Sequence, residues 1–322
     1  MHRILRSQPG RLPWALVVPA VIVLGGGCAQ LKPGHVGAIT EPWSYNGFTG
    51  RRITTEHFEV ISTLRDAEFE AALPGFVEAA YKRYESTVPS SAQPDRRLTI
   101  YVLATRPEWL RFTRCRFPAR LPVYSKIRAG GYTEGNTSVL FHANRWSTLA
   151  TIAHEGWHQY VALHVRAAMP AWLNEGLACW HEAVDWSGPL PRFTPQHNTY
   201  RLNSLRSALR ENRVLPLAEL LDTDPGAIIG RDDNRLTQEY YAQVWALITF
   251  LRTGSRHAGA FDALLRDIGE GRYSARVGAA RLVSADAAHI SPARAVFQTY
   301  FGPILDAGAD QYYDHLVRLA MY

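Results

Sequence analysis

The sequence predicts an α+β fold in which a small mixed sheet with helices precedes a mainly helical half. Two patterns predict this order: strand-like alternation of apolar residues occurs before residue 146, and helical periodicity dominates after it. The composition suits a folded chain, because 47% of the 322 residues are hydrophobic and 20% are charged. We therefore expect one folded unit over residues 51–322, with an α/β part over 51–145 and a helical part over 146–322.

Strand and helix patterns alternate in the α/β part. We expect strands over 57–61 and 97–103, helices over 66–84 and 107–113, and a hairpin over 131–141 that turns at Gly135-Asn136. In the helical part we expect helices over 147–164, 170–184, 201–211, 237–252, 258–268, 291–301 and 303–320, and a loop over 186–198. Packing of the two parts should leave an active-site cleft between them.

The first 27 residues have the layout of a secretory signal peptide. Three Arg precede an apolar stretch from Leu12 to Leu24, which is followed by three Gly and Cys28. The stretch is short for a membrane span and contains two Pro, so cleavage and export to the cell envelope or periplasm are expected. Small residues before a Cys also resemble the lipobox of bacterial lipoproteins, which implies a lipid anchor on Cys28. Residues 28–50, which contain several Pro and Gly, are interpreted as a tether.

The charge of the chain argues against a nucleic-acid partner. The formal net charge is +6, and it falls to +3 without residues 1–27, which hold three Arg and no Asp or Glu. This small excess is scattered along the sequence, so it predicts no phosphate-binding face.

The cysteines leave two alternatives. If Cys28 carries lipid, Cys115 and Cys179 either pair in an oxidising compartment or remain as buried free thiols.

The segment 153–158 contains an H-E-x-x-H motif within an expected helix. His154 and His158 lie four residues apart, which places them about 40° apart around the helix axis, so both imidazoles can bind one metal ion. Glu155 lies beside them, where it can act as a general base toward an attacking water and later protonate the leaving amine.

Two residues compete as the third metal ligand. His164 follows His158 by six residues, as in metzincins, but Val161 stands where that pattern needs a Gly to break the helix. Glu175 is the other candidate, and the family resemblance of its segment, described next, favours it. Two His and one carboxylate leave a fourth coordination position open, which is the arrangement of a catalytic Zn²⁺.

The sequence around Glu175 resembles a known family. Residues 170–178 read P-A-W-L-N-E-G-L-A, which is similar to the W-L-N-E-G-[FL]-A segment of the aminopeptidase N family and, more broadly, of gluzincin peptidases with a peptidase MA-like, zincin-type domain. The resemblance implies that Glu175 is the third zinc ligand. It extends to Glu182, which either orients a metal-binding His or solvates its helix.

A second resemblance lies downstream. The segment starting at Tyr241 is similar to the family's Y-x-K-G-A helix, although Gln243 and Val244 replace the Lys and Gly. The resemblance implies that Tyr241 hydrogen bonds to the oxyanion of the tetrahedral intermediate. A packing role for Tyr241, or the same catalytic role for Tyr240, remains an alternative.

The sequence gives little information about the substrate. The family's amine-binding G-x-M-E-N segment is absent, and Glu134 is interpreted as a hairpin-turn residue. The strand Ser138–Phe141 is expected to form an edge along which an extended peptide can pair.

The favoured function is that of an exported zinc metallopeptidase acting on a peptide or protein. An inactive binding module of the same fold, or a zinc hydrolase of another bond, is the alternative.

Overall fold

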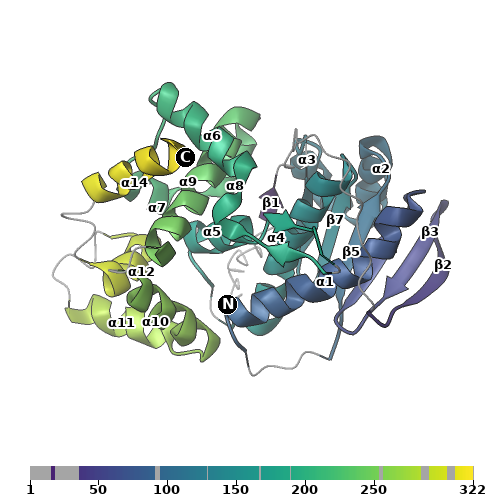
Figure 1. Ribbon diagram of the computed structural model, residues 1–322, viewed down its shortest axis with the longest axis horizontal. Coiled ribbons are helices and arrows are strands. Elements are labelled where there is room, and N and C mark those ends of the chain that lie inside the picture. The colour runs from purple at the N-terminus through teal and green to yellow at the C-terminus, as the bar shows by residue number, and fades with distance from the viewer. Residues whose placement is uncertain are drawn as a thin grey trace, which may run out of the picture.

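The computed structural model describes residues 16–18, 36–90, 95–128, 130–166, 168–188, 190–253, 257–283, 290–302 and 309–321. The first half is a mixed sheet with four helices, and the second half is mainly helical (Figure 1). This arrangement confirms the predicted α+β fold.

The sheet has seven strands in the order β1-β6-β7-β5-β4-β3-β2. They are β1 (Leu16–Val18), β2 (Ile39–Tyr45), β3 (Phe48–Thr54), β4 (Phe58–Ser62), β5 (Leu98–Leu103), β6 (Gly131–Glu134) and β7 (Thr137–Phe141). The central strands β4, β5 and β7 are parallel, and the other neighbours are antiparallel. The helices of this half are α1 (Ala67–Thr87), α2 (Arg106–Arg116), α3 (Leu121–Tyr124) and α4 (Arg145–His164).

Both faces of the central strands are buried. Successive strand residues point to opposite faces, and Val60 and Leu140 pack with α1 and α4 while their neighbours Ile61 and Val139 pack with α2 and α3. The sheet therefore fixes α4 against one face, with the H-E-x-x-H segment in the interior.

The interpretation of residues 28–50 as a tether is wrong for residues 39–50, which form β2 and the start of β3. The two strands pair from Ile39 with Thr54 to Tyr45 with Phe48. The turn residues Asn46 and Gly47 have φ values of 45° and 76°, as in the tight turns that suit β-hairpins. The Asn-Gly pair between two alternating segments is the signal for this hairpin.

Strand β1 lies within the segment expected to be the signal peptide. Its three residues pair antiparallel with Gly131–Thr133 of β6, and β1 also contacts α4 and α8 (Pro225–Gly230). The remaining residues of the expected signal, and Cys28, lie outside the described residues.

The expectation that Ser138–Phe141 forms an edge is also wrong. Strand β7 lies between β5 and β6, and β6 is the strand that would form the edge without β1. The hairpin turn itself is confirmed, with Gly135 at φ 60°.

The helical half contains α5 (Ala171–Trp180), α6 (Thr199–Arg210), α7 (Leu217–Asp222), α8, α9 (Asn234–Thr253), α10 (Ala258–Gly269), α11 (Tyr273–Val283), α12 (Pro292–Phe301) and α14 (Ala309–Met321). Most of these helices were predicted, but α7, α8 and α11 were not, and α5 ends at Trp180 rather than at residue 184. The expected loop over 186–198 is mostly irregular, although β9 (Arg192–Phe193) pairs there with β8 (Val184–Asp185). Helix α9 lies at the centre of this half and packs on α5, α6 and α10.

Cys115 is exposed and Cys179 is buried, and both are free thiols. Among the described residues, we found no helix with the length and apolar character needed to cross a membrane.

We expect Gly176→Ala to destabilise the protein, because a Cβ atom at Gly176 would lie 2.6 Å from Ile248 Cγ1 and 2.8 Å from the Val244 carbonyl oxygen on α9. Overpacking of this kind lowers the free energy of unfolding by about 1–3 kcal/mol. Gly278→Ala is the matched control, since a Cβ there meets no atom within 4 Å, and Ala in a helix stabilises by up to about 1 kcal/mol. Denaturant unfolding of both variants measures the difference, and equal effects would contradict a tight α5–α9 contact.

Candidate metal centre

Helix α4 presents both histidines of the H-E-x-x-H motif to the interior. The helix begins after Asn144, whose side chain accepts a hydrogen bond from the Ser147 backbone N–H at 2.9 Å. His154 and His158 are 0% and 2% exposed, and their ring centres lie 4.9 Å apart. The two rings therefore share one side of the helix, as their spacing predicts.

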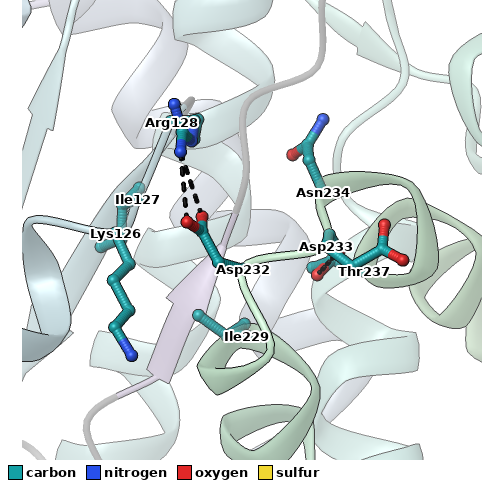
Figure 2. Close-up of a pocket in the computed structure, with 8 residues that line it drawn as sticks. All are labelled: Lys126, Ile127, Arg128, Ile229, Asp232, Asp233, Asn234 and Thr237. Carbon is teal, nitrogen blue, oxygen red and sulfur yellow. Dashed lines mark hydrogen bonds and ion pairs between the residues drawn. The ribbon is translucent and has the colours of Figure 1, made fainter.

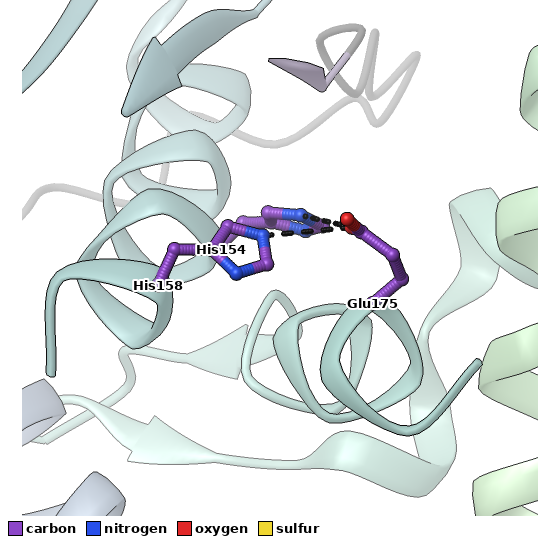
Figure 3. Close-up of side chains that lie close together, drawn as sticks. All are labelled: His154, His158 and Glu175. Atoms are coloured by element: carbon purple, nitrogen blue, oxygen red, sulfur yellow. Dashed lines mark ion pairs between the residues drawn. The ribbon is translucent and has the colours of Figure 1, made fainter. Parts of the chain in front are cut away.

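Helix α5 brings Glu175 opposite these rings (Figure 3). Glu175 Oε2 lies 3.4 Å from His154 Nε2 and 3.5 Å from His158 Nε2. Burial alone would raise the pKa of the Glu175 carboxyl, but the two adjacent histidines outweigh burial and lower this pKa to about 2. Glu175 is therefore an anion directed at the imidazole pair.

The donor atoms of these three residues fit a metal ion. Nε2 of both histidines and both Glu175 oxygens are buried without a hydrogen-bond partner, a costly state for polar groups in a protein interior. Ligand atoms at about 2.0–2.1 Å from a tetrahedral zinc lie about 3.3–3.4 Å from one another, which is close to the two measured separations. Imidazole and carboxylate ligands in this number are those of catalytic zinc.

Glu182 holds the outer nitrogen of His154. Its Oε1 accepts a hydrogen bond from His154 Nδ1 at 2.8 Å, so Nε2 is left to face Glu175. The carboxylate is itself fixed by the fully buried Arg201, which donates to both oxygens at 2.6 and 2.8 Å, and by Asn198 at 2.9 Å. Burial opposes ionisation, but Arg201 and His154 lower the Glu182 pKa to about 2. The contacts of Glu182 therefore match the orientation of a histidine and not the solvation of its helix.

Glu155 is fully buried beside the three candidate ligands and contacts the sheet. Its Oε2 accepts a hydrogen bond from Thr133 on β6 at 2.5 Å, and its Oε1 has no hydrogen-bond partner. Burial raises the Glu155 pKa to about 8 against the lowering effects of the His154 charge and the Thr133 hydroxyl. A divalent cation held nearby would act in the same direction as these two groups.

Tyr240 and Tyr241 are both buried next to the centre. The Tyr241 ring lies 5.9 Å from the His154 ring, and the Arg201 guanidinium lies 5.1 Å from the Tyr241 ring centre. The Tyr240 hydroxyl is buried without a hydrogen-bond partner. Both phenols therefore stay candidates for the oxyanion contact.

His164 and Glu134 lie outside the centre. His164 Nε2 is 2.9 Å from the Tyr81 hydroxyl, and its ring stacks on Tyr160, which places it on another side of α4. Glu134 accepts hydrogen bonds from Arg120 and Tyr124, so it is a structural residue at the end of β6.

Sequence reasoning missed Thr133, Asn198 and Arg201. Thr133 lies on β6, while Asn198 and Arg201 belong to the start of α6. No motif or spacing relates these residues to H-E-x-x-H, because they reach the centre only through the packing of the sheet and α6.

A separate pocket is lined by residues from both halves of the molecule (Figure 2). Its lining includes Lys126 and Arg128 after α3 and Asp232 between α8 and α9, and Arg128 forms an ion pair with Asp232 at 3.2 Å. None of the candidate metal ligands lines this pocket, so it is not the centre described above.

Comparison with known proteins gives one match. A family model described as "Protein of unknown function (DUF1570)" matches residues 148–272. This range contains the two histidines, Glu175, Glu182, Arg201 and Tyr241. No curated protein and no solved structure matches the chain.

We expect the protein to bind a single zinc ion, and His154→Ala, His158→Ala and Glu175→Ala each to lose it, because each removes one of the converging donors. His164→Ala is the control and should keep its zinc, since its ring packs elsewhere. Metal analysis after dialysis, with circular dichroism to confirm folding, tests this. Zinc retained by Glu175→Ala but lost by His164→Ala would make His164 the third ligand.

We expect Glu182→Gln to weaken zinc binding by about 10–100-fold, because the carboxylate that orients His154 is lost. Glu239→Gln is the matched control: Glu239 is also buried and paired with an arginine, Arg213, but it belongs to none of the metal-ligating groups found among the described residues. Competition with a chelator of known affinity measures both variants. An equal loss of affinity in both would assign the effect to destabilisation alone.

Proposed function

We propose that the protein is a zinc-dependent metallopeptidase. The observation that carries the proposal is the buried convergence of three unpartnered ligand groups from His154, His158 and Glu175, with the carboxylate of Glu155 beside them. In a cluster with a purely structural role, buried polar atoms normally have hydrogen-bond partners. The resemblance of the Glu175 segment to aminopeptidase N-type gluzincins supports the same function.

Each residue has a defined part in the proposed hydrolysis. A zinc ion held by the three ligands would supply Lewis-acid chemistry, lowering the pKa of water and polarising a carbonyl. Glu155 accepts the proton of the attacking water and passes it to the leaving amine. Thr133 orients Glu155 through its 2.5 Å hydrogen bond and leaves the second oxygen free.

The proposed substrate is a peptide or protein segment bound in an extended form along β6. The pairing of Leu16–Val18 with Gly131–Thr133 supports this, because it shows that the β6 edge accepts an antiparallel strand. β6 also carries Thr133, so a peptide on this edge would run next to Glu155. In the proposed exported form, cleavage before Cys28 would remove β1 and leave the β6 edge open.

An inactive binding module and a hydrolase of a non-peptide bond are the competing functions. The buried Glu155, oriented by Thr133, argues against a binding module, since binding alone needs no general base. Hydrolysis of an unbiased peptide library by the zinc-loaded protein tests the proposal. Cleavage supports it, and zinc binding without cleavage contradicts it.

We expect Glu155→Gln to abolish hydrolysis while the fold and zinc content are kept. Gln has nearly the shape of Glu and can still accept the Thr133 hydrogen bond, but an amide cannot take up the proton. Loss of general-base catalysis costs about 10²–10⁴-fold in rate, and kcat of the zinc-loaded variant measures it. Undiminished turnover would show that the H-E-x-x-H segment is not the catalytic machinery.

We expect Tyr241→Phe to lower kcat with little change in KM or zinc content, because an oxyanion contact acts mainly in the transition state. Tyr240→Phe is the paired variant, since its hydroxyl is also buried next to the centre. If only Tyr240→Phe lowers kcat, the oxyanion contact belongs to Tyr240. Normal kcat in both variants would remove this step from the mechanism.

A further inference from the structure

A second group of unpartnered polar atoms lies where α1, α5 and α9 meet. Arg83 Nε, Arg252 Nη1, Trp180 Nε1 and both ring nitrogens of His181 are buried without a hydrogen-bond partner. The indole and both guanidinium groups can only donate hydrogen bonds. This group therefore has more hydrogen-bond donors than acceptors. The candidate metal centre is the opposite, because its unpartnered atoms offer electron pairs.

Arg83 lies on α1, Trp180 ends α5, His181 follows it, and Arg252 lies on α9. The Arg252 guanidinium carbon lies 5.5 Å from the Trp180 ring centre. The ring of His181, the residue after Trp180, lies 5.0 Å from the ring of Tyr84, which follows Arg83 on α1. His181 is 0% exposed, and burial together with the charges of Arg83 and Arg252 lowers its pKa well below the ordinary value. Two cations thus adjoin a neutral imidazole.

No carboxylate of the described residues forms an ion pair with Arg83 or Arg252. Glu182, next to His181, is occupied by Arg201, Asn198 and His154. Asp262 lies near Arg252 but is exposed. Burial lowers the pKa of both arginines, and the Arg83 charge lowers the pKa of Arg252 further.

This lack of an acid sets the pair apart from the fully buried Arg201, which has its carboxylate. Half-buried cations without a counterion are costly. Arg252 lies in the last turn of α9, where the helix dipole favours a cation. The dipole does not provide an acceptor for Arg83, Trp180 or His181.

We propose that Arg83, Arg252, His181 and Trp180 bind a small tetrahedral oxyanion, phosphate or a phosphate monoester. Two guanidinium forks match the spacing of phosphate oxygens. The indole and one imidazole N–H supply further donors to the remaining oxygens. The anion neutralises the two arginines and fills the unmet hydrogen-bonding capacity of all four side chains.

Calorimetric titration of the full chain with inorganic phosphate tests the site. We expect binding to a single site and a higher Tm in phosphate. Arg83→Gln and Arg252→Gln should each weaken binding by about 10–100-fold, because each removes hydrogen bonds between charged groups. Lys82→Gln is the matched control: it removes the same charge from the neighbouring, exposed position on α1 and should bind phosphate normally.

A thermal measurement separates this role from a structural one. Without phosphate, the two Arg variants should be at least as stable as the wild type, because repulsion between the arginines is removed, yet they should lose the phosphate-dependent rise in Tm. Phosphatidylcholine vesicles with and without phosphatidic acid distinguish the source of the anion. Selective binding to the vesicles that contain phosphatidic acid indicates a lipid headgroup. Binding of inorganic phosphate without binding to either vesicle indicates a soluble ligand. If the wild type binds neither probe, or if the Arg variants bind as tightly as the wild type, the proposal is overturned.

Discussion

The close approach of α5 to α9 at Gly176 is the constraint on which the candidate metal centre depends. A Cβ atom there would lie 2.6 Å from Ile248 Cγ1, so only Gly allows this separation. Glu175 precedes Gly176 and faces the opposite partner, α4. Helix α5 therefore sits between two helices at distances set by side-chain volume, and the 3.4 Å separation of Glu175 from His154 follows from that packing.

On the His154 side of the candidate centre, the outer ring nitrogen is held by a chain of hydrogen bonds, while the candidate ligand atoms have no partner. His154 Nδ1 is held by Glu182, and Glu182 by Arg201. In contrast, His154 Nε2 and both Glu175 oxygens have no hydrogen-bond partner. Such an arrangement holds the His154 ring in a fixed orientation, and the ion pair between Arg201 and Glu182 offsets the cost of burying charge.

The sequence predicted the parts of the centre that depend on local spacing. His154, His158 and Glu155 follow from helical geometry, and Glu175 and Glu182 follow from a family resemblance. The supporting residues Thr133, Asn198 and Arg201 could not be predicted, because nothing local in β6 or α6 shows what they contact. In the same way, the α+β order and most helices were predicted from periodicity, whereas the position of β7 inside the sheet depends on which strand pairs with β5. The β2–β3 hairpin had a local signal, Asn46-Gly47, that was outweighed by the surrounding Pro and Gly.

The reach of Arg201 defines how much of the chain is needed to rebuild the centre in another protein. Arg201 lies on α6, donates hydrogen bonds to the Glu182 carboxylate after α5, and donates another to the Gln238 side chain on α9 at 3.0 Å. A transplanted segment from α4 to residue 182 would carry all three candidate ligands but leave Glu182 without the arginine that pairs with it. The shortest segment that contains the candidate ligands together with Glu182, Arg201 and Gln238 therefore runs from α4 to α9. This segment lies almost entirely within the range matched by the family model.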